Sequence, residues 1–241
     1  MADQTASAWT APCYLVGKPP ELPTNWAVSF PTSKLRTSIK MKFKAGDETD
    51  QKLCLMLKHE YFRCGEALAD FKLAAQQLQR GEDSRTISYR AYNAYARFIL
   101  HLYEFILACD QRVRGDTTEI KGEVADGVIA ASTKIAYKHA TAALNSAPLG
   151  AAPLNSGIDQ PIEKLKEFGN ALRRARNTAM GHVKHERAEL SLSVFYSKYH
   201  KYLLALHRSA MHMWGSMGDE FPDLGEVTAF SVLVKSDTSP L

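Results

Sequence analysis

Apolar residues recur every three or four positions in four long stretches of the chain, and this spacing predicts four amphipathic helices. Gly81 can end the first helix, and Ser84 suits the N-cap of the second. Pro161 suits the first turn of the third helix. Four such helices predict an all-α fold with a core like a four-helix bundle. The expected ranges are 49–80, 84–113, 161–180 and 186–216.

The two ends of the chain have a different pattern. Five prolines in residues 1–46 exclude a long helix there. Residues 38–44 alternate apolar residues with lysines, which predicts an edge strand, and the β-branched and aromatic residues of 227–235 predict a second strand. We therefore expect short terminal β-strands beside the helical body. The chain then divides into an N-terminal extension at 1–46, the bundle at 47–220, and a C-terminal strand and tail at 221–241.

The stretch 115–160, between the second and third expected helices, has the composition of an irregular insertion. Residues 119–144 could hold a weak helix, which Gly122 and Gly127 would interrupt. Proline, glycine, serine and asparagine dominate the end of this stretch and indicate a loop. We expect this insertion to be the most mobile part of the fold.

The charge of the whole chain is only mildly positive. A net charge of +4 and a pI near 8.8 do not describe a polycation, so any affinity for nucleic acid must come from local clustering. The four cysteines form no CxxC pair, as in proteins with reduced thiols. No stretch approaches the length of a membrane span, and the N-terminus lacks the basic start of a secretory signal. We expect a soluble cytoplasmic protein with no membrane contact.

Several common chemical motifs are absent from the sequence. It contains neither of the common glycine-rich phosphate loops, no GxSxG elbow and no HExxH motif. His182 and His185 could place two imidazoles together, but zinc takes three or four ligands, and only Glu186 and Glu189 are near. We therefore expect no metal and no cofactor.

The stretch RRARNTAMGHVKH (173–185) carries the most specific combination of polar residues. Arg176 is followed directly by Asn177, and His182 comes after Gly181, which can break the helix. Residues 164–187 hold seven Lys or Arg against two Glu, an excess that attracts phosphate. The alternative interpretation is a solvated basic helix end whose arginines are favoured by the helix dipole.

An arginine, a polar residue and then a histidine near the end of a helix resemble the Arg-x(4–6)-His signature of the HEPN superfamily, named for higher eukaryotes and prokaryotes nucleotide-binding. RNTAMGH at 176–182 matches that signature, and the four expected helices resemble its bundle. Many members are metal-independent endoribonucleases of toxin–antitoxin, abortive-infection and CRISPR systems. Others lack nuclease activity and bind nucleotides or proteins. One subgroup is controlled by a nucleotidyltransferase antitoxin through a tyrosine two residues after the histidine; Lys184 stands there in this chain, so that control is not expected.

The residue types suit RNA cleavage, in which the 2′-hydroxyl attacks the adjacent phosphorus. A histidine titrates near neutrality and can move protons, and an arginine fork can stabilise charge that develops on the phosphate. Asn177 can orient the phosphate or the histidine. The candidate catalytic residues are Arg176, Asn177 and His182, and the candidate RNA-binding residues are Arg173, Arg174, Lys184 and His185.

Helix geometry bears on how these groups could meet. Six residues of an ideal helix rotate about 600°, so Arg176 and His182 would point about 120° apart. They converge within one chain if the helix breaks at Gly181, or across a two-fold axis if two copies share one cleft. The resemblance also implies a homodimer with a composite site.

The sequence therefore predicts a metal-independent endoribonuclease that acts on RNA as a toxin or antiviral-defence effector. Its expected partners are RNA, a second copy of the chain, and an antitoxin or other regulatory protein. The alternative function is a non-catalytic HEPN-like module that binds a nucleotide or a partner protein. A third is an all-α interaction protein in which the basic helix end is incidental.

Overall fold

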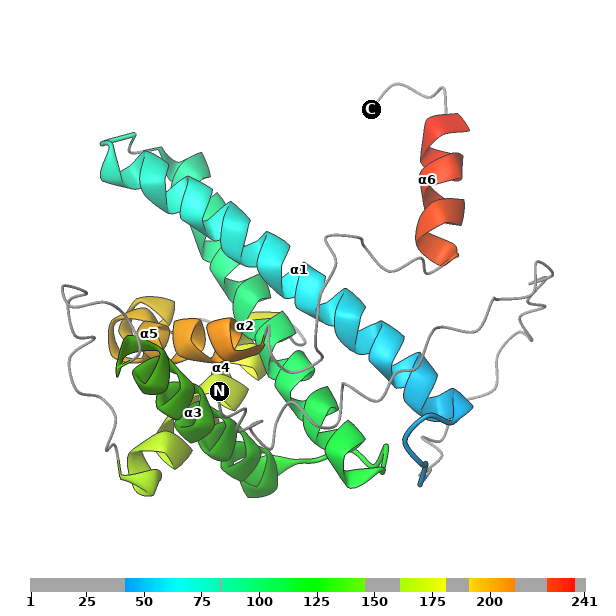
Figure 1. Ribbon diagram of the computed structural model, residues 1–241. Helices are drawn as coiled ribbons and strands as arrows, with labels where there is room; N and C mark the ends of the chain where they lie inside the picture. Colours follow the sequence, from blue (N-terminus) through cyan, green and yellow to red (C-terminus); the bar gives the residue numbers. More distant parts are fainter. Residues whose placement is uncertain (1–41, 83, 146–160, 181–190, 211–224, 237–241) are drawn as a thin grey trace.

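The structure is a computed structural model that describes residues 42–82, 84–145, 161–180, 191–210 and 225–236. Helices dominate these residues, and no strand is assigned within them, so the predicted all-α class is confirmed for this part of the chain. The helices are α1 (Glu48–Gln79), α2 (Arg85–Arg114), α3 (Gly122–Asn145), α4 (Ile162–Met180), α5 (Leu192–Ala210) and α6 (Glu226–Ser236) (Figure 1). None of them combines the length and the apolar character that crossing a bilayer would require.

Helices α1 and α2 form a long antiparallel hairpin whose ends follow from local chemistry. The Asp47 carboxylate caps α1 by accepting from the Asp50 amide, and the Ser84 side chain caps α2 by accepting from the Ile87 amide. After α1, Gly81 has a φ of 83°, a left-handed conformation that glycine adopts without steric cost. The predicted first and second helices are therefore confirmed, including the Ser84 cap and the break at Gly81.

The core lies where α2 packs against the other four helices of the body. Large side chains with no exposed surface come from α2, α3, α4 and α5, and α1 adds Leu57 and Cys64. Each such apolar side chain stabilises the fold by about 1.5–3 kcal/mol through its removal from water. The fully buried residues on the four helices include Phe98, Phe105, Ile129, Phe168 and Leu203.

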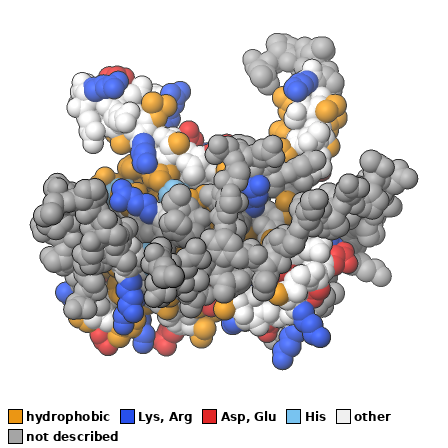
Figure 2. All heavy atoms as spheres, viewed as in Figure 1, with side chains coloured by type: hydrophobic (Ala, Val, Ile, Leu, Met, Phe, Trp, Pro, Cys, Tyr) orange, Lys and Arg blue, Asp and Glu red, His pale blue; other side chains and the backbone are white. Residues whose placement is uncertain are grey.

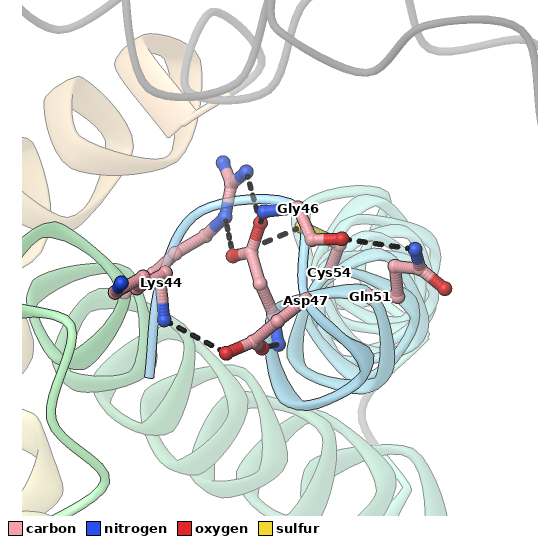
Figure 3. Close-up of polar contacts among 7 residues, drawn as sticks. Lys44, Gly46, Asp47, Gln51 and Cys54 are labelled. Carbon is pink, nitrogen blue, oxygen red and sulfur yellow. Dashed lines mark hydrogen bonds and ion pairs between the residues drawn. The ribbon is translucent and has the colours of Figure 1, made fainter. Parts of the chain in front are cut away.

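A buried ion pair fixes the open end of the hairpin (Figure 3). Arg112 near the end of α2 donates to the Asp50 carboxylate in the first turn of α1, at 2.7 and 3.2 Å. The Gly46 amide donates to the same carboxylate at 2.8 Å. Burial alone would raise the pKa of Asp50, but Arg112 and the Gly46 amide outweigh it and hold the pKa below its usual value.

The stretch around 122–145 differs from the expected irregular insertion, because it forms the continuous helix α3. Gly122 starts this helix rather than interrupting it, and Gly127 lies within it. Ala125, Ile129 and Ala130 are buried against the core, and this burial outweighs the modest cost of glycine in a helix. Residues 146–160, the loop-like end of the predicted insertion, lie outside the described residues. Within the described residues, five helices (α1–α5) pack together, one more than the four predicted.

The predicted strand at 227–235 is wrong, since these residues belong to α6. Its apolar residues come in runs such as Val232–Val234 instead of alternating, and a strand also needs a partner to pair with. Of the other predicted strand, residues 38–41 lie outside the described residues, and Lys42 makes only an isolated antiparallel bridge to Asp116. Helix α6 stands apart from the other helices in Figure 1.

Candidate functional site

The candidate site begins near the C-terminal end of α4, where Arg176 and Asn177 lie. The third predicted helix is confirmed here, since it runs from Ile162 to Met180. His182, Lys184 and His185 lie outside the described residues, so their places in the site stay predictions. The described part of the fourth predicted helix is α5, from Leu192 to Ala210.

Three groups hold the Arg176 guanidinium in place. It forms an ion pair with the Glu104 carboxylate of α2, and its Nη1 donates to Asn177 Oδ1 at 2.9 Å. The guanidinium carbon lies 5.7 Å from the centre of the Tyr103 ring, a cation–π distance. The Arg176 and Glu104 side chains keep 36% and 39% of their surface exposed, so a ligand in solvent can reach both. The Arg176 Nε is buried and has no hydrogen-bond partner among the described residues.

Arg173 has a different environment, although it lies one helical turn before Arg176. Its Nε and Nη2 donate to the two carboxylate oxygens of Asp126 on α3, at 2.8 and 2.9 Å, and Asn170 adds a third contact at 3.3 Å. The Asp126 carboxylate raises the pKa of Arg173, which is already a permanent cation. Arg173 thus joins α3 to α4, and this structural contact was not foreseen from the sequence. Arg174, by contrast, is exposed.

A cavity of about 330 Å³ lies beside these arginines, between α2, the segment before α3, and α4. Its wall combines aliphatic residues with paired charges, among them Lys121 and Glu119, whose Nζ and Oε2 atoms are 2.9 Å apart. The lining residues are Tyr103, Glu104, Leu107, Ala108, Gln111, Glu119, Ile120, Lys121, Gly122, Arg173, Arg176 and Asn177. The sequence analysis did not predict that α2 and residues 119–122 would lie beside Arg176 and Asn177. These segments are distant in the chain and meet only through tertiary packing.

On the face shown in Figure 2, positively charged side chains of the described residues stand in separate groups. Figure 2 shows Lys and Arg side chains at several places on the visible face, with apolar and acidic side chains between them. This distribution agrees with the mild net charge of +4. Among the described residues, the surroundings of Arg176 are the feature that could select a phosphate.

Two histidines of α5 lie among aromatic rings. The His207 ring is stacked on Tyr61 with centroids 5.5 Å apart and meets Phe98 edge-on, and burial lowers its pKa to about 4. His200 lies against Tyr196 at 4.4 Å, and its Nδ1 is 3.2 Å from the Tyr95 hydroxyl. These contacts are those of core residues.

One further polar pair bridges α1 and α2. His101 Nδ1 lies 2.6 Å from Glu60 Oε1, and both side chains are mostly buried. Within the described ranges, no group of three His, Cys, Asp or Glu residues is arranged to hold a metal ion.

Comparison with known proteins identified no relative of this chain. No family model, no curated protein and no solved structure matches this chain. The function is therefore inferred from Arg176, Asn177 and the residues that contact them.

Proposed function

We propose that the protein is a metal-independent endoribonuclease of the HEPN type. The observation that supports this most is the placement of the half-exposed Arg176 and the exposed Asn177 at the end of α4 and at the edge of a cavity. Glu104 and Tyr103 of α2 hold the guanidinium, so it is ordered before a ligand arrives. His182 follows Arg176 by six residues in the chain.

In the proposed reaction the 2′-oxygen of one ribose forms a bond to the adjacent phosphorus, and the bond from phosphorus to the 5′-oxygen breaks. The products are a 2′,3′-cyclic phosphate and a 5′-hydroxyl. His182 takes the proton from the 2′-hydroxyl or gives one to the leaving oxygen. Arg176 stabilises the negative charge on the non-bridging oxygens, and the Asn177 amide orients the phosphate. Lys184, His185 and the exposed Arg174 add affinity for the RNA backbone.

The working form is proposed to be a homodimer in which α4 and α5 contribute to the interface. Two copies would bring two Arg176 and two His182 side chains into one cleft, which removes the angular mismatch along a single helix. A defence or toxin role in the cytoplasm, with an antitoxin or other regulator, fits an enzyme that would damage cellular RNA.

The test compares cleavage of a mixed RNA pool by the parent protein, His182→Ala and Arg176→Ala, all in EDTA. We expect the parent to leave 2′,3′-cyclic phosphate ends, and each variant to be about 10²–10⁴-fold slower. Arg90→Ala is the matched control, because Arg90 is an exposed arginine of α2 near the far end of the hairpin. If a folded His182→Ala protein cleaves as fast as the parent, the catalytic assignment is wrong.

A second candidate function is a non-catalytic module that binds a nucleotide or a protein. The ion pair between Arg176 and Glu104 favours it, because a carboxylate already neutralises much of the arginine's charge. This candidate predicts no cleavage by the parent protein, and a loss of ligand affinity when Arg176 is changed.

A further inference from the structure

The cavity beside Arg176 has a lining whose charges are balanced. Each basic side chain that faces it is paired with a carboxylate: Arg176 with Glu104, Arg173 with Asp126, and Lys121 with Glu119. A phosphate buried inside would need an excess of positive charge or of free donors to offset its desolvation. The interior therefore suits a neutral ligand group better than an anion.

The walls of the cavity combine polar side chains with a smaller aliphatic surface. Leu107, Ala108 and Ile120 supply aliphatic surface, and the Gln111 and Asn177 amides supply donors and acceptors. Its volume, about 330 Å³, is near the lower end of the range for small-molecule sites, about 300–1,000 Å³. A flat ring with apolar faces and polar edges, such as a nucleobase, has the matching chemistry.

We infer that this cavity receives one nucleobase of the RNA and prefers a base with an exocyclic amino group. The carboxylates of Glu104 and Glu119 only accept hydrogen bonds, and adenine, cytosine and guanine present amino groups that donate them. Uracil has no amino group to offer. The inference rests on the proposed function for the placement of the phosphate, which stays outside the cavity beside Arg176 and Asn177.

The experiment measures equilibrium binding of the four nucleoside 5′-monophosphates to the full chain by calorimetry or NMR titration, without any cleavage step. At least one of AMP, CMP and GMP should bind about tenfold more tightly than UMP. Ala108→Phe fills the cavity and should remove that binding, whereas Val113→Phe, on an exposed position of the same helix, should not. Glu119 is exposed, so Glu119→Gln should disturb folding little. This variant should reduce the ratio of the affinities for the amino-bearing nucleotides and for UMP.

Equal binding of all four nucleotides, no binding at millimolar concentration, or parent-like binding by a folded Ala108→Phe variant would each overturn the inference. Because the assay needs no catalysis, it separates the two proposals. Selective binding without RNA cleavage would refute the nuclease and keep the base site. RNA cleavage together with equal binding of the four nucleotides would support the nuclease and refute the base site.

Discussion

Gly169 of α4 is the position where a single added methyl group should most disturb the site. A Cβ atom built there would lie 2.5 Å from the Asp126 carbonyl oxygen of α3 and 2.9 Å from its Cα. These are backbone atoms, which cannot rotate away, so α3 and α4 would have to separate by about 0.9 Å to restore ordinary contact at 3.4 Å. The same separation would strain the two hydrogen bonds from Arg173 to Asp126.

We expect Gly169→Ala to lower the free energy of unfolding by about 2 kcal/mol. Overpacking costs about 1–3 kcal/mol, and strained hydrogen bonds to a charged group add to it, while alanine recovers about 1 kcal/mol of helix propensity over glycine. Gly127→Ala is the matched control, because it adds the same methyl group to α3 where nothing lies within 4 Å. The free energy of unfolding of Gly127→Ala should rise by about 0.5–1 kcal/mol.

Urea unfolding followed by circular dichroism measures both variants, with stability read from the midpoint at unchanged slope. The expected difference between them is about 3 kcal/mol. If the two variants unfold at the same urea concentration, the close approach of α3 and α4 at Gly169 is not a real constraint on the fold.

Two further predictions concern stability. Asp50→Asn should cost about 3–5 kcal/mol because it leaves the Arg112 guanidinium buried without its carboxylate, whereas Asp70→Asn, which breaks the exposed pair with Arg97, should cost under about 1 kcal/mol. Equal losses in urea unfolding would contradict that contrast. His207 stays neutral in the fold because burial lowers its pKa from 6.5 to about 4, while the unfolded chain takes up the proton, so stability should fall by about 3 kcal/mol between pH 7 and pH 4. His207→Phe should flatten that part of the pH dependence of stability, and an unchanged slope would refute the assignment.

The helices predicted from the sequence were those whose apolar spacing and end signals agreed. The regular apolar stripe of α2 and the Ser84 cap are both local features of the sequence. The stripe marks the face that is buried, and the cap marks a hydrogen bond at the start of the helix. The error at α3 came from weighing Gly122 and Gly127 as breaks, although tertiary burial decides whether a helix of small residues forms. At α6, β-branched composition favoured a strand, but that preference depends on a pairing partner that the pattern did not supply.

The site shows a different limit of sequence reasoning. The motif at 176–182 could be found because its residues are neighbours in the chain, but Glu104 precedes Arg176 by 72 positions. Glu104 lies one residue after the buried Tyr103, and nothing in the local pattern tells it from other helical carboxylates. Only the packing of α2 against α4 gives it a partner. The same packing changes the interpretation of Arg173, which is bound to Asp126 while Arg174 faces solvent.

Arg173 and Arg176 differ in how much of their hydrogen-bonding capacity is already used inside the protein. Arg173 and Asp126 have 24% and 7% of their side chains exposed and satisfy each other through two parallel hydrogen bonds, so neither has much left for a ligand. Arg176 and Glu104 are more open, and the guanidinium is shared between a carboxylate, an amide oxygen and an aromatic ring. A phosphate that approaches from solvent can take up donors of Arg176 without dismantling the contact between α3 and α4. The proposed substrate-binding role requires Arg176 to exchange partners, and its open contacts allow this, while Arg173 keeps the helix that carries Arg176 in place.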